Sequence, residues 1–134
     1  MASMTGEYLG ALRTEDTHQL SGNKIITDAP PDNNGKGEAF SPTDLVCAAL
    51  SSCMMTIMGI LAQKEGIDLK GLKSQITKIM SANPRRISEI QIIFSLPGLS
   101  ATDGQKEKLK NAAMSCPVAL TLGDGVKQSI TFDF

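Results

Sequence analysis

Two cysteines of this chain lie in surroundings where a thiol could do chemistry. Cys53 lies in a helical run that carries no charge between Asp44 and Lys64, and Cys116 lies in a Ser-Cys-Pro-Val sequence at the junction of two further helical segments. A cysteine reacts as the thiolate, which is favoured by a nearby positive charge or by the backbone N–H groups of a helix start. One thiol in an uncharged helix and one at a helix junction could therefore form a redox pair.

Cys116 has a helix start of its own. With Pro117 at the first position of a new helix, Cys116 becomes the N-cap, where backbone N–H groups favour negative charge. The alternative is a cysteine that only packs against its neighbours at a helix kink. The sequence leaves both interpretations open.

Cys53 needs a partner from outside its own helix. Because the helix carries no cation near Cys53, the candidates are Arg13, Lys24, Arg85 and Arg86. Arginine suits the role because it stays charged and presents a rigid fork of donors. The alternative is that Cys53 is a small buried hydrophobic residue, as cysteines in apolar helices usually are.

The third cysteine is predicted to belong to the core. Cys47 precedes Cys53 by six positions, about 240° around a helix, so the two side chains cannot share a face. With no Cys-x-x-Cys pair and His18 as the one histidine, the sequence also predicts no metal site.

The long helix that carries Cys53 has clear boundaries. Ser41 can cap it, Pro42 suits its first position, and Asp44 is an acid three residues after the cap. Gly66 is expected to end it. Asp44 has two interpretations, as a capping acid or as a carboxylate that also orients an arginine.

The other segments predict strands in hairpins and two shorter helices. Strands are expected over residues 8–13, 24–27, 72–80, 87–96 and 126–134, and helices over residues 102–114 and from residue 117. Because the strands come in hairpins and not in βαβ alternation, the predicted fold class is α+β, a mainly antiparallel sheet with two main helices. One domain over residues 1–134 is expected.

Composition excludes several classes of function. A net charge of −1 without a basic patch argues against nucleic-acid binding. No secretion signal is visible at residues 1–6, and three cysteines do not make a disulfide scaffold, so a cytoplasmic protein is expected. The uncharged run over residues 45–63 reaches membrane-spanning length, but its polar residues and missing aromatic anchors favour a core or interface helix.

The cysteine motifs together resemble a known family. The run from Phe40 to Leu45, the Ala-Ala-Leu-Ser-Ser-Cys sequence that ends at Cys53, and the later Cys116-Pro117-Val118 are similar to the motifs of the osmotically inducible protein C and organic hydroperoxide resistance family (OsmC/Ohr). The predicted order of hairpins and helices agrees over nearly the whole chain.

The resemblance implies a thiol peroxidase of the oxidative stress response. It implies that Cys53 attacks an organic hydroperoxide and becomes a sulfenic acid, and that Cys116 then condenses with it to a disulfide. An external dithiol or lipoyl-type reductant would reopen that disulfide, without a bound cofactor. The resemblance also implies that Arg13 steadies the thiolate and that the fold is an intertwined homodimer with its sites at the subunit interface.

The chain departs from the family pattern at the acid that holds this arginine. Ten residues before Cys53, where the family has glutamate, the chain has Thr43, and Asp44 is one position late and one methylene shorter. We expect Asp44 to take over this role from an adjacent direction, or the arginine to be held differently.

Two alternatives to a peroxidase follow from the same sequence. The departure at Thr43 favours a small-ligand or lipid-binding module that keeps the fold without efficient turnover. A structural, redox-responsive interaction protein is the second alternative. Apolar residues near Cys53 could form a pocket for organic hydroperoxides or could be plain core: Met54, Met55, Ile57 and Met58.

The protein is predicted to be a homodimer. The helix over residues 45–62 is apolar on too many sides for one layer to cover, and a symmetric pair is the commonest way to bury such a surface. Light scattering at micromolar concentration should give twice the chain mass of 14.2 kDa. A well-behaved monomer would contradict this prediction.

Overall fold

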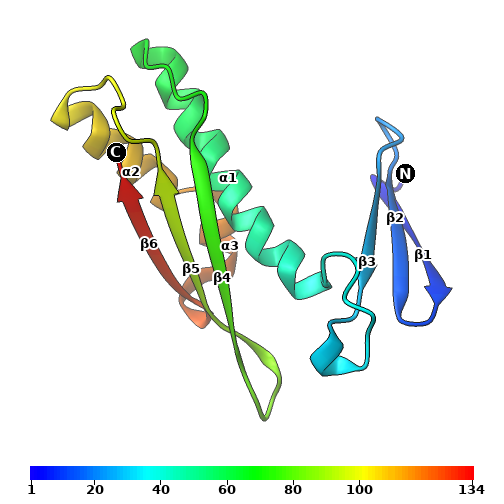
Figure 1. Cartoon of the computed structure of the whole chain (residues 1–134). Coiled ribbons are helices and arrows are strands. Elements are labelled where there is room, and N and C mark those ends of the chain that lie inside the picture. The colour runs from blue at the N-terminus through cyan, green and yellow to red at the C-terminus, as the bar shows by residue number, and fades with distance from the viewer. The chain divides into compact units, whose positions relative to one another are not determined.

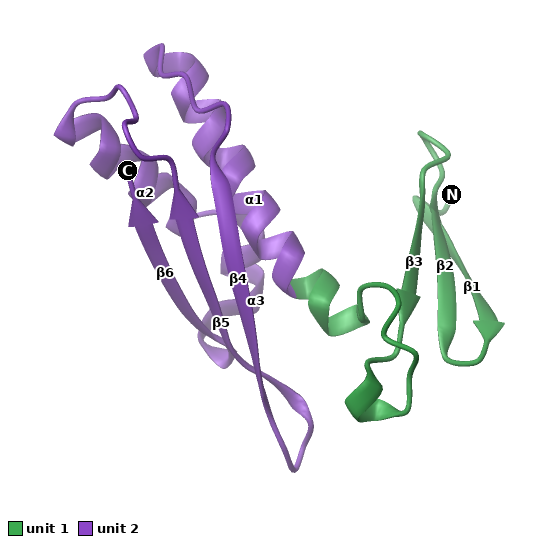
Figure 2. Cartoon of the chain, viewed as in Figure 1, with its two compact units in different colours: residues 1–46 green, residues 47–134 purple.

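The computed structural model describes all 134 residues and divides the chain into two compact units. Unit 1 is Met1–Val46 and unit 2 is Cys47–Phe134 (Figure 2). The boundary falls inside helix α1, Pro42–Glu65, so its first turn belongs to unit 1 and the rest to unit 2. A single functional domain over the whole chain stays a prediction.

Unit 1 is built on a three-stranded antiparallel sheet (Figure 1). Its strands, in the order in which they pair, are β1 (Met4–Gly10), β2 (Arg13–His18) and β3 (Lys24–Asp28). The expected strand over residues 8–13 is wrong, because a turn lies inside it: Gly10 pairs with Arg13, and the chain reverses at Ala11 and Leu12.

The turn between β1 and β2 is made by residues that rarely form one. Ala11 and Leu12 have φ angles of 51° and 61°, the conformation of a two-residue hairpin turn that asparagine and glycine usually supply. For other residues this conformation costs roughly 1–2 kcal/mol each. Since neither Ala11 nor Leu12 favours turns, the sequence gives no local signal for a turn at this position.

A tight loop follows β3 and leads to α1. A short 3₁₀ helix, Pro31–Asn33, opens it, and the backbone folds back on itself through Gly35 N–H to Pro30 O at 2.9 Å and Gly37 N–H to Ala29 O at 3.2 Å. A Cβ atom at Gly35 would collide with the carbonyl group of Ala29. This position therefore accepts only glycine.

Unit 2 is a three-stranded sheet with helices packed on one face (Figure 1). The sheet has the order β4 (Lys73–Ser81), β5 (Arg86–Ser95) and β6 (Lys127–Asp133), and the helices after β5 are α2 (Asp103–Met114), α3 (Pro117–Leu122) and a 3₁₀ turn at Gly123–Gly125. The α+β class is confirmed. One detail differs from expectation, because β6 pairs with β5 in parallel and not antiparallel.

The core of unit 2 lies between α1 and the sheet. Leu50, Met54 and Met58 of α1 recur every four residues and are fully buried. Alternate residues of β5 face them and are fully buried as well: Ile90, Ile92 and Phe94. Phe94 also stacks on Phe132 of β6, with 5.6 Å between the ring centroids. Met54 and Met58 are therefore core residues and not part of a pocket.

Polar contacts fix α1 to its neighbours within unit 2. Ser51 donates a hydrogen bond to Ser74 of β4 at 2.8 Å, and Lys108 of α2 pairs with Glu65 at 3.0 Å. The helix has the length and composition of a membrane-spanning segment, with a mean hydropathy of 2.1 over 18 residues, of which 33% are buried. Central helices of soluble proteins have the same properties, so this alone is weak evidence for a membrane.

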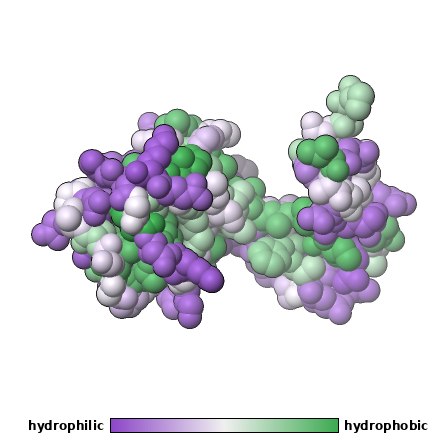
Figure 3. Space-filling view, turned by 90° about the horizontal axis from the view of Figure 1, so that it is seen from above, coloured by the Kyte–Doolittle hydropathy of each residue, from purple (hydrophilic) through white to green (hydrophobic).

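Exposed apolar side chains are conspicuous in unit 1. The sheet buries little of its own, and its large apolar residues stay exposed to solvent (Figure 3): Met4, Tyr8, Leu9, Leu12, Ile25 and Ile26. Single exposed apolar residues are ordinary, but a set of this size on one small sheet is unusual.

Gly35→Ala should destabilise the protein, because the new methyl group meets backbone and no side chain can rotate away. We expect a loss of roughly 1–3 kcal/mol in the free energy of unfolding, measured in urea. The matched control is Gly59→Ala in α1, where nothing lies within 4 Å of the added Cβ. That change should stabilise by roughly 0.5–1 kcal/mol. Equal effects of the two changes would contradict the role of Gly35.

Candidate thiol site

Cys53 lies at the edge of the buried stripe of α1. It follows the fully buried Leu50 by three residues and precedes the fully buried Met54, and its own side chain is only half-buried. The thiol is thus carried by a rigid helix and still reaches the surface of unit 2. This combination suits a thiol that must meet a substrate.

Cys116 caps helix α3, which is one of the two interpretations that the sequence left open. Its backbone is extended, Pro117 occupies the first helical position, and its Sγ accepts a hydrogen bond from the backbone N–H of Ala119 at 3.3 Å. The side chain is fully buried. The N-cap interpretation is therefore confirmed, and the cysteine also packs as a core residue.

The two thiols lie together in unit 2. Cys53 is close enough to Cys116 to affect the pKa of its thiol, and no disulfide joins any of the three cysteines. Burial raises the pKa of the Cys116 thiol above its usual value, and the neighbouring Cys53 adds to the rise. The N–H groups of Ala119 and Val118 act in the opposite direction, but desolvation is the larger effect.

This pair can carry a defined sequence of thiol chemistry. Cys53 is the more accessible thiol, so an oxidant in solution meets it first. Once Cys53 is a sulfenic acid, the adjacent Cys116 can condense with it and form a disulfide. The burial of Cys116 shields it from direct attack, because buried thiols with raised pKa are inert.

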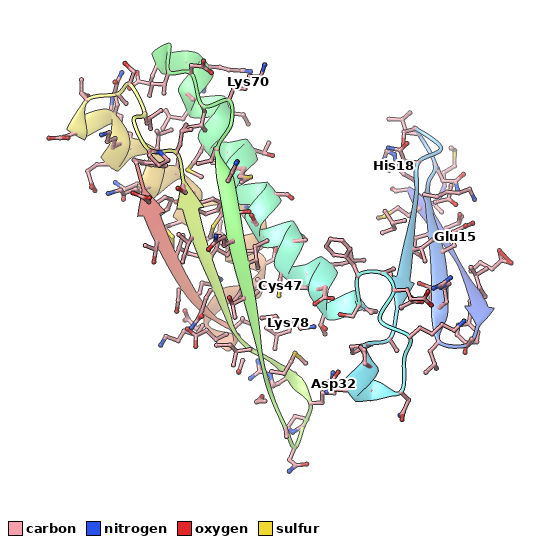
Figure 4. All side chains as sticks on the ribbon, in the orientation of Figure 1. Glu15, His18, Asp32, Cys47, Lys70 and Lys78 are labelled. Carbon is pink, nitrogen blue, oxygen red and sulfur yellow. The ribbon has the colours of Figure 1, made fainter.

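The third cysteine is placed apart from this pair. Cys47 is buried in α1, with 3% of its side chain exposed (Figure 4). Its place on the helix differs from that of Cys53 by about 240°. The prediction that it belongs to the core is confirmed.

Asp44 forms a reciprocal cap at the start of α1. Its carboxylate accepts a hydrogen bond from the backbone N–H of Ser41 at 3.0 Å, and the Ser41 hydroxyl accepts one from the backbone N–H of Asp44 at 3.0 Å. Thr43 lies 3.1 Å from the same hydroxyl. The capping interpretation is confirmed, and the role of Asp44 in chemistry stays a prediction.

Arg13 makes its closest contacts with an acid that the sequence analysis missed. Its Nε lies 2.7 Å from Asp28 Oδ1 and its Nη2 lies 2.8 Å from Asp28 Oδ2, while Glu38 is a weaker partner at 3.5 Å. The hydrogen bond from Arg13 lowers the pKa of Asp28 below its usual value. Arg13 and Asp28 are a cation and an acid on adjacent strands, which a sequence can reveal. The pair becomes visible only when the register of β2 and β3 is known.

Two other candidate cations have structural partners of their own. Lys24 pairs with Glu15 of β2, which is labelled in Figure 4, at 2.9 Å. Arg86 donates to the carbonyl oxygen of Gly125. The partnership between Arg13 and Cys53 joins residues of different units and stays a prediction. No group of three His, Cys, Asp or Glu side chains that could hold a metal ion occurs in the structure.

Comparison with known proteins finds relatives over nearly the whole chain. A family model described as OsmC-like protein matches residues 35–131. The structure is similar to an osmotic stress induced and detoxification response protein from Psychrobacter arcticus, with a TM-score of 0.94 and 44% identity over 98% of this chain and 96% of that one. No curated protein matches the chain.

More distant structures share the fold. An OsmC-like protein of unknown function from Vibrio cholerae has a TM-score of 0.81 at 17% identity, over 98% of this chain and 99% of that one. An organic hydroperoxide resistance protein from Legionella pneumophila has a TM-score of 0.74 at 15% identity, over 100% of this chain and 98% of that one. At such identities the likeness concerns the fold and not the chemistry.

The raised pKa of Cys116 predicts a pH-dependent contribution to stability. Because its pKa is higher in the folded protein than in the unfolded chain, the contribution is complete below the unfolded value, about 8.5, and is lost as pH rises through the folded value. The difference in unfolding free energy between the wild type and Cys116→Ser should therefore shrink from pH 8 to pH 10. Urea unfolding under a non-thiol reductant measures it. A constant difference would show that desolvation of Cys116 has no energetic effect.

Proposed function

Because the chain belongs to the OsmC-like protein family, we propose that it detoxifies organic hydroperoxides as a cysteine-based peroxidase. The single observation that carries the proposal is the pairing of Cys53 with Cys116, one thiol half-buried and the other fully buried. Structural relatives named organic hydroperoxide resistance proteins support the same class of substrate.

The proposed reaction has three steps. The Cys53 thiolate attacks one oxygen of the hydroperoxide, the O–O bond breaks, and the alcohol leaves after taking up a proton, so that Cys53 becomes a sulfenic acid. The Cys116 sulfur then displaces the sulfenic hydroxyl as water and forms a disulfide. An external dithiol or lipoyl-type reductant reopens the disulfide by thiol exchange and is itself oxidised to a disulfide.

The environment of the thiols supports these two roles. Cys53 is accessible on one side of α1, whereas burial keeps Cys116 protonated and out of reach of a bulky peroxide. Because Cys116 is a neighbour of Cys53 in unit 2, it is the thiol placed to meet a sulfenic acid there. The opposite assignment would require the substrate to enter the core.

An apolar surface beside Cys53 favours an organic substrate over hydrogen peroxide. Ile57 and Ile60 follow Cys53 by four and seven positions, so they share its face of α1; Ile57 is half-buried and Ile60 is exposed. These side chains offer contacts to an alkyl or aryl group, each worth its buried apolar area. Met55 is about 200° from Cys53 around the helix and lies on another face.

Arg13 and Asp44 complete the proposed site. Arg13 supplies a permanent positive charge for the Cys53 thiolate, and Asp44 holds the start of α1, the helix that carries Cys53. We further propose a cytoplasmic homodimer, in which a second copy covers the exposed apolar side chains of unit 1.

One observation favours a second candidate function. Thr43 stands where the family has an acid, so the chain could bind a small apolar ligand or a lipid without efficient turnover. A protein of that kind would bind cumene hydroperoxide but would not consume it.

Mass spectrometry of the intact protein after cumene hydroperoxide tests the proposed reaction. The wild type should lose two hydrogens as Cys53 and Cys116 join. Cys53→Ser should consume no peroxide, and Cys116→Ser should consume one equivalent and gain one oxygen, then a second with excess peroxide. Cys47→Ser is the matched control and should behave as the wild type.

Two outcomes would overturn the reaction as written. Many turnovers by Cys116→Ser would exclude Cys116 as the resolving thiol. An unchanged mass of the wild type would favour the ligand-binding function.

A further inference from the structure

The two sulfur atoms of the proposed disulfide differ in their access to solvent. The Cys116 side chain is fully buried, whereas the Cys53 side chain is half-buried. A thiolate can attack either sulfur of a disulfide, and the other sulfur then leaves. Access to the two sulfurs therefore bears on which cysteine an external reductant meets.

The backbone of Cys116 is held on both sides. Its N–H donates to Ala113 O of α2 at 3.3 Å, and its carbonyl oxygen accepts from the Leu120 N–H of α3 at 3.0 Å. Helix α3 is tied to β6 in turn, because the Gln128 side chain donates to Ala119 O at 3.0 Å. Cys116 cannot turn toward solvent while these bonds stay intact.

A reaction at Cys116 would therefore require a local opening of unit 2. Its neighbours Leu109 and Ala113 are fully buried, and Ala119 is 5% exposed. Groups enclosed in this way meet solvent molecules only through local unfolding. An opening that costs about 1.4 kcal/mol already slows a reaction tenfold. Cys53 needs no such opening, because its side chain is partly exposed on a regular helix.

The strength of the leaving group acts in the opposite direction. A thiol of higher pKa leaves more slowly, and burial raises the pKa of Cys116. By this criterion alone, the expulsion of Cys116 is disfavoured. The N–H of Ala119, which donates to the Cys116 sulfur at 3.3 Å, offsets part of the effect by meeting the departing charge. Since attack first requires contact between two sulfur atoms, access decides the direction.

We propose that the reductant attacks the Cys53 sulfur and that Cys116 is the sulfur that leaves. The inference rests on the proposed function for the disulfide itself and adds the direction in which the disulfide opens. In this cycle Cys116 acts only within the protein. It closes the disulfide and is expelled from it, without contact with the peroxide or the reductant.

The reduction then runs in two exchanges. One thiolate of the dithiol reductant bonds to the Cys53 sulfur, the bond between Cys53 and Cys116 breaks, and Cys116 leaves with the electron pair and takes up a proton. The second thiol of the reductant loses its proton and attacks the reductant's own sulfur in the mixed disulfide. Cys53 returns as the thiolate, and the reductant ends as a disulfide.

The test traps the mixed disulfide with a monothiol, which cannot complete the second exchange. In a Cys47→Ser background, diamide forms the disulfide, and a short exposure to N-acetylcysteine is stopped with acid. Peptide mass spectrometry should find N-acetylcysteine on Cys53 and a free thiol at Cys116, in at least about tenfold excess over the reverse arrangement. If Cys47→Ser does not fold, the wild type serves, because peptide fragmentation separates Cys47 from Cys53.

The matched control is the same treatment in concentrated urea, where both sulfurs are exposed and the excess should disappear. Equal adducts in the folded protein, or a main adduct on Cys116, would overturn the proposal. An excess on Cys53 that persists in urea would overturn it as well, because the fold would not be the cause. The absence of any disulfide after diamide would show that the two sulfurs do not meet, which also refutes it.

The use of diamide separates this proposal from the peroxidase function. A protein that forms the disulfide with diamide but not with cumene hydroperoxide would contradict the peroxidase function alone. A protein that forms it with both oxidants, but carries N-acetylcysteine on Cys116, would contradict only the direction of reduction.

Discussion

The packing of α1 on the sheet of unit 2 is the interaction on which the thiol site depends. Leu50, Met54 and Met58 are fully buried and recur every four residues, so only one rotation of the helix satisfies them. That rotation leaves Cys53 at the edge of the buried stripe, next to Cys116. A rotation by one residue, about 100°, would carry the thiol into the core or away from its neighbour. The position of one sulfur atom is thus a consequence of apolar packing along the helix.

The two thiols show how one residue type acquires two chemical characters. Cys116 has the helix N-cap that normally favours a thiolate, yet complete burial outweighs the backbone N–H groups and raises its pKa. Cys53 lies in the middle of α1, away from the free N–H groups of a helix start, and its side chain is partly exposed to solvent. In the ion pair of unit 1, the Asp28 side chain is buried and the Arg13 side chain is partly exposed to solvent.

Local signals in the sequence were the most informative ones. Ser41, Pro42 and Asp44 predict the start of α1, and Pro117 predicts that Cys116 is an N-cap, because capping involves only neighbours in the chain. Features that depend on distant partners were missed. The parallel pairing of β6 has no local signature. The turn at Ala11 and Leu12 is made by residues that avoid it. The pairing of Arg13 with Asp28 depends on the register of the β2–β3 hairpin, and the sequence analysis did not place β2 in that hairpin.

The parallel pairing of β5 and β6 has a thermodynamic consequence for the proposed redox cycle. The crossover between these strands contains α2 and α3, and it carries Cys116 to α1 from a distant part of the chain. A disulfide to Cys53 would tie the crossover to the central helix and close a loop of more than sixty residues. Restricting the unfolded chain in this way is worth about 4 kcal/mol. The oxidised protein would then be more stable against unfolding than the reduced protein, and each reduction would remove that stabilisation.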